Sequence, residues 1–224
     1  MKKLLYVTAS PKPETESTSK QAGRAFVGRF ITDNPDYTLE ELDLPTADIP
    51  EPIHRYFKGR CELVSGPEFD VLSEDDKLVV NRMNDLCTQF QSADAYVIAA
   101  PMWSLSFPSR LKQYLDCIML NNRLIRLSDD GVKGLLCDKP RKMVYIQSSG
   151  GIYPKIFYSK LNYGVKYFHD IFKYLGIKEF HKILIQGTDM SNVGKDKALA
   201  CAAEDFECVL KKMTCSDSKF PISA

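Results

Sequence analysis

Hydroxyl side chains gather directly after the first apolar segment of the chain. Ser10 ends that segment, and Ser17, Thr18 and Ser19 stand where a helical pattern begins. The first turn of a helix offers unpaired N–H groups and the positive end of the helix dipole, which suits a phosphate, and neutral hydroxyls can add further donors. The same residues could equally be helix caps and turn residues. The two glutamates within this loop should point away from a bound anion.

A second candidate loop follows another apolar segment and reads Pro101, Met102, Trp103, Ser104 and Leu105. A methionine and a tryptophan at the end of a buried strand offer flat apolar contact to an aromatic ring system, while backbone N–H groups can bind its polar atoms. The alternative interpretation is a tryptophan that fills the core below the edge of the sheet.

A third loop follows a third apolar segment and contains Ser148, Ser149, Gly150 and Gly151. Two adjacent glycines let the backbone approach a ligand closely, although an ordinary tight turn would also use them. Tyr153, a little further on, could donate to a substrate, although packing would explain it as well. Together the loops predict a phosphate site, an apolar ring site and a glycine-lined edge, which is the layout for flavin mononucleotide (FMN).

Several competing chemistries lack the residues they need. The sequence has no G-x-x-x-x-G-K-[ST] loop, no G-x-G-x-x-G turn and no cluster with the spacing of metal ligands. A receiver-type site would need an aspartate where the third strand instead ends in Ala99, Ala100 and Pro101. The 30 Lys and Arg residues balance the 29 Asp and Glu residues, so the net charge of +1 argues against a nucleic-acid partner.

Apolar runs and turn residues indicate the elements that must position these loops. The patterns predict strands over residues 3–9, 37–42, 93–100, 142–147 and 179–186, and helices over residues 17–32, 73–91, 108–120, 160–175 and 196–213. Such alternation implies a parallel sheet with helices on both faces. We therefore predict a flavodoxin-like three-layer α/β/α sandwich with a five-stranded parallel sheet in the order 2-1-3-4-5, while a Rossmann-like order stays open. In either case ligands bind beyond the carboxyl ends of the strands.

The alternating pattern predicts one domain over residues 1–213, because no repeat, linker or change of composition interrupts it. Residues 45–72, rich in proline and glycine, should form a long excursion with a helical turn near 54–57, and residues 122–138 a hairpin-like one. Residues 214–224 should be a loose tail. No segment is apolar enough for a membrane span, and the seven cysteines lack a disulfide or zinc pattern, so we predict a cytoplasmic protein.

At these loops the chain resembles the FMN-dependent NADH-azoreductase family, a group of flavodoxin-like quinone and azo-compound reductases. The matching segments are the first strand through Ser10 and residues 17–19, 99–103, 111–116 and 148–152. Their order and spacing agree over nearly the whole chain. The resemblance implies FMN held non-covalently, its phosphate at Ser10 and residues 17–19. It also implies that residues 102–105 line the ribityl chain and isoalloxazine, and residues 148–151 the polar rim.

The resemblance further implies NADH or NADPH as electron donor, quinones and azo compounds as acceptors, and a homodimer whose partner subunit completes the site. We expect a ping-pong two-electron mechanism in which the chemistry belongs to the flavin, so no catalytic side chain is named. The family often has Tyr-Asn-Phe where this chain has Trp103, Ser104 and Leu105, and Arg at the position of Ser149. Ile125 and Arg126 of the hairpin-like excursion are further candidates for reaching the pocket.

Three alternative functions stay open. A flavodoxin-like electron carrier would dock protein partners, but such carriers are usually acidic, and the net charge of +1 speaks against one. A flavin reductase that supplies free reduced FMN to another enzyme would retain its flavin weakly. A scaffold or regulator would keep the fold without FMN.

Overall fold

A computed structural model describes residues 1–153 and 161–214 of the chain. Its central sheet contains β1 (Lys2–Thr8), β2 (Tyr37–Asp43), β5 (Ala95–Pro101), β8 (Lys142–Ser149) and β9 (Glu179–Gln186). The strands are all parallel and lie in the order β2-β1-β5-β8-β9, so β2 and β9 are the outermost strands. This order confirms the predicted 2-1-3-4-5 arrangement and excludes the Rossmann-like alternative.

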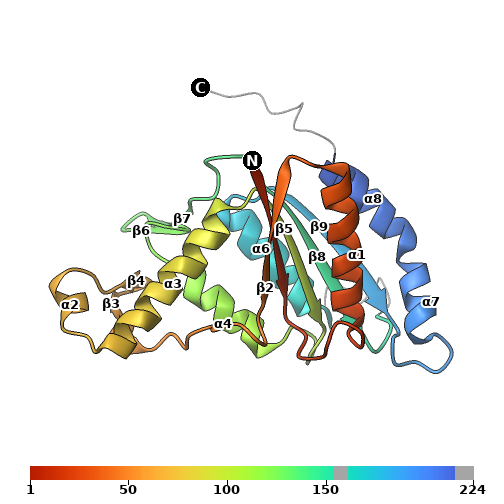
Figure 1. Ribbon diagram of the computed structural model, residues 1–224, viewed down its shortest axis with the longest axis horizontal. Coiled ribbons are helices and arrows are strands. Elements are labelled where there is room, and N and C mark those ends of the chain that lie inside the picture. Colours follow the sequence, from red (N-terminus) through yellow and green to blue (C-terminus); the bar gives the residue numbers. More distant parts are fainter. Residues whose placement is uncertain (154–160, 215–224) are drawn as a thin grey trace.

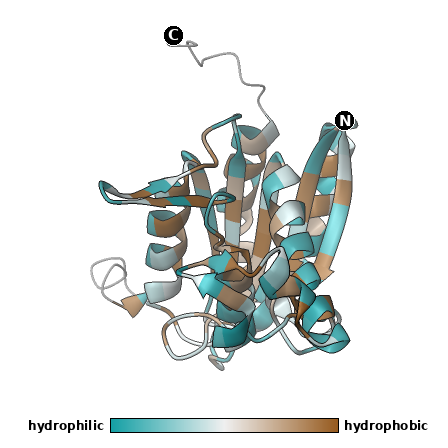
Figure 2. Cartoon of the chain, turned by 90° about the vertical axis from the view of Figure 1, so that its left-hand side faces the viewer, coloured by the Kyte–Doolittle hydropathy of each residue, from teal (hydrophilic) through white to brown (hydrophobic). Residues whose placement is uncertain are grey.

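Helices cover both faces of the sheet (Figure 1). The helices α1 (Thr18–Asp33), α7 (Gly194–Cys201) and α8 (Ala203–Thr214) lie on one side, and α3 (Glu74–Ser92), α4 (Ser109–Ile118) and α6 (Tyr163–Leu175) on the other. Each side has its own apolar cluster, built around Phe26 and Phe30 on one face and around Phe90, Phe168 and Phe172 on the other. Figure 2 accordingly shows the central strands as largely hydrophobic, as strands buried on both faces must be.

Local sequence signals explain where the main helices begin and end. The side chains of Ser17 and Ser73 accept from the backbone N–H groups of Lys20 and Asp76, and so cap α1 and α3. Gly176 ends α6 in the left-handed region at φ 115°, where an added Cβ would lie 2.7 Å from the backbone nitrogen of Cys137. A side chain would therefore be both strained and crowded at this position.

The last predicted helix, residues 196–213, is instead two helices, α7 and α8. At the junction the N–H of Ala202 bonds to the carbonyl of Leu199, three residues back, which interrupts the helical ladder. The break involves no proline or glycine, so the sequence pattern carried no signal for it. The predicted helix over 160–175 begins at Tyr163, with Asn162 as its cap, and residue 160 lies outside the described residues.

The two excursions are more ordered than their composition suggests. The first contains the predicted helical turn, η1 (His54–Tyr56), followed by β3 (Phe57–Gly59), β4 (Glu62–Leu63) and α2 (Pro67–Asp70). The second is the predicted hairpin, formed by β6 (Ile125–Ser128) and β7 (Gly131–Gly134). Of the predicted loose tail, only Thr214 is described, and it ends α8. None of the described helices is long and apolar enough to cross a membrane.

A buried arginine bonds to several segments at the amino edge of the sheet, the side on which the strands begin. Arg141 is 4% exposed, and its guanidinium donates to the carbonyls of Gln91 at 2.9 Å, Leu136 at 3.0 Å and Ala93 at 3.2 Å. It also pairs with Asp138 at 2.6 Å. Burial opposes ionisation of Asp138, but the hydrogen bond from Arg141 and its charge outweigh this and lower the pKa of that carboxyl. The guanidinium donors of Arg141 are thus satisfied by hydrogen bonds within the fold.

Candidate functional site

A cavity of about 350 Å³ opens where β1, β5, β8 and β9 end. We call it the strand-end cavity. Residues from all three predicted loops line it: Ser10, Ser17, Thr18, Pro101, Met102, Trp103, Ser148, Ser149 and Gly150. Ser19, Ser104, Leu105 and Gly151 belong to the same loops but do not line the cavity. The lining therefore contains most of the predicted site, drawn from segments that are far apart in the sequence.

The hydroxyl loop caps α1, as one interpretation predicted, and also lies at the cavity. Ser17 is 3% exposed and caps α1, because its Oγ accepts from the N–H of Lys20 at 3.3 Å. It also lines the cavity, as Ser10 and Thr18 do. Ser19 is fully buried behind it, with the two Oγ atoms 3.3 Å apart, which is why Ser19 is absent from the lining. The first turn of α1 has no acidic residue, so its N–H groups can attract an anion.

Polar contacts on the far side of the loop hold α1 in place. The hydroxyl of Tyr6 donates to the carbonyl of Lys20 at 3.0 Å, and the Lys20 ammonium pairs with Asp43 at 2.8 Å. Burial would raise the pKa of Asp43, but hydrogen bonds from Lys20 and Thr8 lower it below its ordinary value. An added Cβ at Gly23 would lie 2.5 Å from the Tyr6 hydroxyl oxygen. The helix thus packs so closely on the sheet at Gly23 that a side chain could be added there only by moving the helix or Tyr6.

The tryptophan loop forms a tight turn of an unusual kind. The backbone groups of Trp103 and Ser106 bond to each other, with N···O distances of 3.3 and 2.8 Å. The two residues between them, Ser104 and Leu105, have φ values of 47° and 64°, which glycine and asparagine adopt far more readily. Both sit at the tip of the turn, beyond the cavity lining. Trp103 is 48% exposed, so the interpretation of a core-filling tryptophan is wrong.

The glycine loop meets a segment that the sequence analysis did not consider. The carbonyl of Gly150 accepts from the N–H of Asp189 at 3.2 Å. A Cβ at Gly150 would lie 2.4 Å from the Asp189 carboxylate, so a side chain there would displace that carboxylate from the rim of the cavity. Gly151 has no neighbour within 4 Å of such a Cβ. Tyr153 anchors the end of the loop by donating its N–H to Gln186 at 2.7 Å and does not line the cavity, so its substrate contact stays a prediction.

Sequence reasoning missed six lining residues, Pro11, Lys12, Glu16, Thr188, Asp189 and Lys195. Thr188 and Asp189 follow β9, so the strand-end rule that found the first three loops would also have found this one. Lys12 and Lys195 bring cations to the cavity, and neither ammonium makes an ion pair or hydrogen bond with the described part of the chain.

Two glutamates of the first loop and the residues of the β6–β7 hairpin differ in their position relative to the cavity. Glu14 points outward, as predicted, and binds Arg24 at 3.2 Å. Glu16 lines the cavity instead, because the loop turns back where the N–H groups of residues 16 and 17 both bond to the carbonyl of Pro13. Ile125 and Arg126 do not line the cavity, since their hairpin packs against the C-terminal end of α6, at the opposite edge of the sheet.

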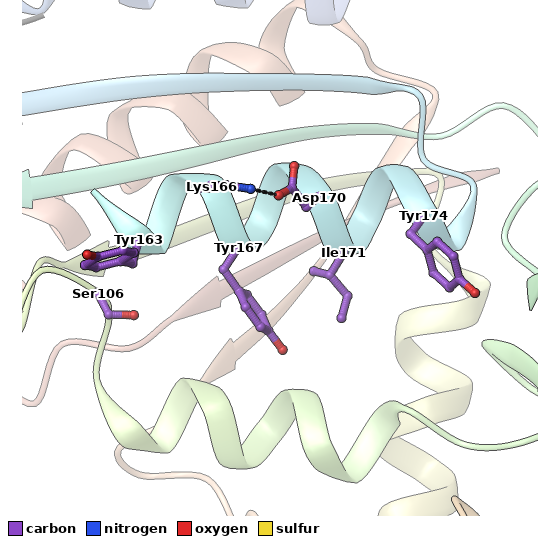
Figure 3. A pocket seen from close by; sticks show the side chains of 7 residues that line it. All are labelled: Ser106, Tyr163, Lys166, Tyr167, Asp170, Ile171 and Tyr174. Atoms are coloured by element: carbon purple, nitrogen blue, oxygen red, sulfur yellow. Dashed lines mark hydrogen bonds and ion pairs between the residues drawn. The ribbon is translucent and has the colours of Figure 1, made fainter. Parts of the chain in front are cut away.

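A larger groove of about 590 Å³ runs along α6, and we call it the α6 groove. Figure 3 shows Tyr163, Tyr167, Ile171 and Tyr174 projecting along one side of the helix. Tyr163 and Tyr174 are 55% and 53% exposed. Ser106, which closes the tryptophan turn, lies at one end of the groove. The groove therefore extends an exposed aromatic surface up to the wall of the strand-end cavity.

Comparison with known proteins agrees with this geometry. A family model described as a flavodoxin-like fold matches residues 2–210. FMN-dependent NADH:quinone oxidoreductase 1 of Clostridium acetobutylicum is 49% identical over 217 residues, which are 97% of this chain and 98% of that protein. The FMN-dependent NADH:quinone oxidoreductase of Ruminiclostridium cellulolyticum is 38% identical over 95% of this chain and all of its own length.

A solved structure is similar over the same range. An FMN-dependent NADH-azoreductase of Bacillus anthracis, crystallised in complex with FMN, superimposes with a TM-score of 0.82 at 28% identity. The match covers 96% of this chain and all of that one. By its fold and its relatives, this chain belongs to the flavodoxin-like family of FMN-dependent NADH:quinone oxidoreductases and azoreductases.

Proposed function

We propose that this protein is an FMN-dependent NADH:quinone oxidoreductase that also reduces azo compounds. The observation that carries the proposal is the strand-end cavity, where one lining combines a helix N-terminus with hydroxyls, a Met-Trp wall and a serine-glycine rim. These are the partners that a phosphate, a flat ring system and its polar edge require. The names of the relatives in Clostridium acetobutylicum and Bacillus anthracis support the same activity.

The residues of the cavity fit FMN. The phosphate belongs at Ser10, Ser17 and Thr18, where neutral donors and the dipole of α1 receive it. The isoalloxazine belongs against Met102 and Trp103, and its polar edge along residues 148–150. When bound, FMN supplies the capacity to accept a hydride and pass on two electrons. The chain binds and orients the reactants, and no acidic or basic side chain is assigned a catalytic step.

The donor and the acceptor are expected to use one open side of the cavity in turn. Both molecules must contact the same flavin ring, which we place against Met102 and Trp103, so we infer that the nucleotide leaves before the quinone enters. This is the ping-pong scheme. Steady-state rates measured against NADH at several fixed quinone concentrations should give parallel double-reciprocal lines.

We further infer a homodimer that forms through the α6 groove. Exposed Tyr163 and Tyr174, with half-buried Tyr167 and Ile171, give this surface the apolar and aromatic character of an association surface. Because Ser106 lies at its end, a second copy seated there would reach the rim of the cavity. A Tyr167→Glu variant should run as a monomer in light scattering, whereas a Tyr37→Phe control should keep the native mass.

Two further assignments belong to the proposal. The family model spans residues 2–210, which supports one domain over residues 1–213. The described cysteines are all free thiols, which suits the reducing conditions of a cytoplasmic location.

One anaerobic experiment tests the function against its rivals. The purified protein, supplied with FMN, should be yellow, should lose the flavin absorbance on addition of NADH, and should recover it with menadione or an azo dye. A protein that binds no FMN would overturn the proposal. Slow bleaching by both NADH and NADPH would favour the electron carrier, and flavin that dissociates on reduction would favour the flavin reductase.

A further inference from the structure

A buried pair of amides lies directly behind the wall of the strand-end cavity. Gln147 stands in β8 just before the two serines of the rim, and Asn162 is the N-cap of α6. Both residues are 2% exposed. The Nδ2 of Asn162 donates to the Oε1 of Gln147 at 2.5 Å. This bond fixes the orientation of the Gln147 amide, because only its oxygen can accept.

The fixed orientation turns the NH₂ group of Gln147 toward the tryptophan turn. Its Nε2 donates to the carbonyl of Ser106 at 3.4 Å and to the hydroxyl of Tyr145 at 3.3 Å. Ser106 closes the turn that presents Trp103 to the cavity. The amide pair therefore contacts the turn from behind, while the exposed tryptophan is on the ligand side.

The start of α6 provides a second attachment to the same turn. The N–H of Tyr163 donates to the carbonyl of Leu105 at 2.9 Å. An added Cβ at Gly164 would lie 3.0 Å from the Nε2 of Gln147 and 3.3 Å from the carbonyl oxygen of Ser106. Consecutive carbonyls of the turn thus bond to two different elements, and a side chain at Gly164 would be crowded between them.

The turn needs this support because its own residues disfavour its shape. A two-residue turn with both central φ values positive usually contains asparagine or glycine. Here Ser104 and Leu105 occupy it at φ 47° and 64°. Left-handed backbone of this kind persists only where the surroundings impose it.

We propose that Gln147 and Asn162 are positioning residues that hold the 103–106 turn in its left-handed form and so fix Trp103 against the flavin. The part that concerns flavin rests on the proposed function. The part that concerns the turn is a property of the chain alone and can be measured without FMN.

The variant that isolates this role is Asn162→Asp. Aspartate caps a helix as well as asparagine does, so α6 keeps its bond from the N–H of Val165. It has no N–H to donate, so Gln147 must reverse its amide and face the carbonyl of Ser106 with an oxygen. Trp103 is the only tryptophan of the chain. In the protein without FMN we expect lower Trp103 fluorescence anisotropy and faster acrylamide quenching.

The same variant should bind FMN about tenfold more weakly, the effect of one lost buried hydrogen bond. A second substitution, Ser104→Asn, should restore much of the anisotropy and affinity, since asparagine tolerates left-handed backbone. The matched control is Ser73→Asp at the N-cap of α3, which should change neither quantity.

Native anisotropy, quenching and FMN affinity in folded Asn162→Asp would overturn the proposal. If that variant does not fold, Gln147→Glu decides the question, because glutamate still accepts from Asn162 but cannot donate to Ser106. Unchanged Trp103 signals in Gln147→Glu would likewise overturn it. Failure of the wild-type chain to bind FMN would refute the proposed function, while the measurements without FMN would still test the turn.

Discussion

The amino edge of the central sheet, where the strands begin, and the carboxyl edge, where they end, differ in how their polar groups are used. At the amino edge, Arg141 donates to four carbonyls and an aspartate, and Lys139 pairs with Asp94 at 2.6 Å. At the carboxyl edge, hydroxyls, free helix N–H groups and an exposed tryptophan line a cavity. Satisfied donors stabilise a fold, whereas donors that are left open can recognise a ligand. The contrast suggests that stability and binding can be altered separately, one edge at a time.

The largest effect is expected at the amino edge. Replacing Arg141 by methionine removes the guanidinium donors from the carbonyls of Gln91 and Leu136, and leaves the carbonyl of Ala93 with the Tyr96 hydroxyl alone. We expect the free energy of unfolding in urea to fall by roughly 2–4 kcal/mol, since each buried carbonyl that loses its donor costs about 1–3 kcal/mol. The FMN dissociation constant of the folded fraction should stay unchanged. The control Arg126→Met, on the exposed hairpin, should alter stability by less than about 0.5 kcal/mol. Equal losses of stability in the two variants would contradict the stabilising role of Arg141.

The second effect belongs to the carboxyl edge alone. Ser17→Asp keeps a good N-cap for α1 but sets a carboxylate where the FMN phosphate is expected. Two like charges about 4 Å apart repel by about 4 kcal/mol in a protein surface environment, so FMN affinity should fall a hundredfold or more. Fluorescence titration of FMN measures the loss, and thermal unfolding should change little. Ser73→Asp is again the control, and unchanged FMN affinity would remove Ser17 from the phosphate site.

A third variant should reduce both stability and FMN binding, and so should link the two properties that the other variants separate. A methyl group at Gly23 meets Tyr6 and Ala99, so Gly23→Ala should push α1 away from the sheet. The free energy of unfolding should fall by about 1–3 kcal/mol, and FMN binding should weaken with it, because the displaced helix carries the phosphate site. Gly28→Ala, in the same helix with open space around it, should stabilise the protein by about 0.5–1 kcal/mol. Equal changes in the free energy of unfolding for Gly23→Ala and Gly28→Ala would show that close packing at Gly23 does not limit its side chain.

The smallest effect is expected at Lys195, one of the two cations of the cavity. Lys195→Ala should raise the FMN dissociation constant about two- to fivefold at low salt, and the difference should shrink at high salt, since partly exposed charges contribute little and are screened. Lys197→Ala, two residues along the same helix and outside the cavity, should have no effect. A larger loss at Lys197 would mean that the general field of α7, rather than Lys195, attracts the ligand.

Most of the fold was predictable because its signals are local. Buried parallel strands appear as apolar runs, and serine caps and Gly176 mark helix ends within a few residues of sequence. The strand-end rule then brought Ser17, Trp103 and Gly150 to one place. What could not be predicted depends on contacts between distant segments. The left-handed turn at Ser104 is imposed by α6 and β8, and the break at Ala202 has no local marker.

The outermost strands restrict how copies of this protein can meet. An edge strand exposes unpaired backbone groups that invite further strands, and charged side chains discourage such growth. Here β2 carries Glu40 and Glu41, and β9 carries Glu179 and Lys182. A continuous sheet through β2 of two copies would bring Glu40 and Glu41 of one copy close to those of the other. Charged side chains on β2 thus disfavour growth of the sheet through that strand, which leaves the helical faces for the association proposed at the α6 groove.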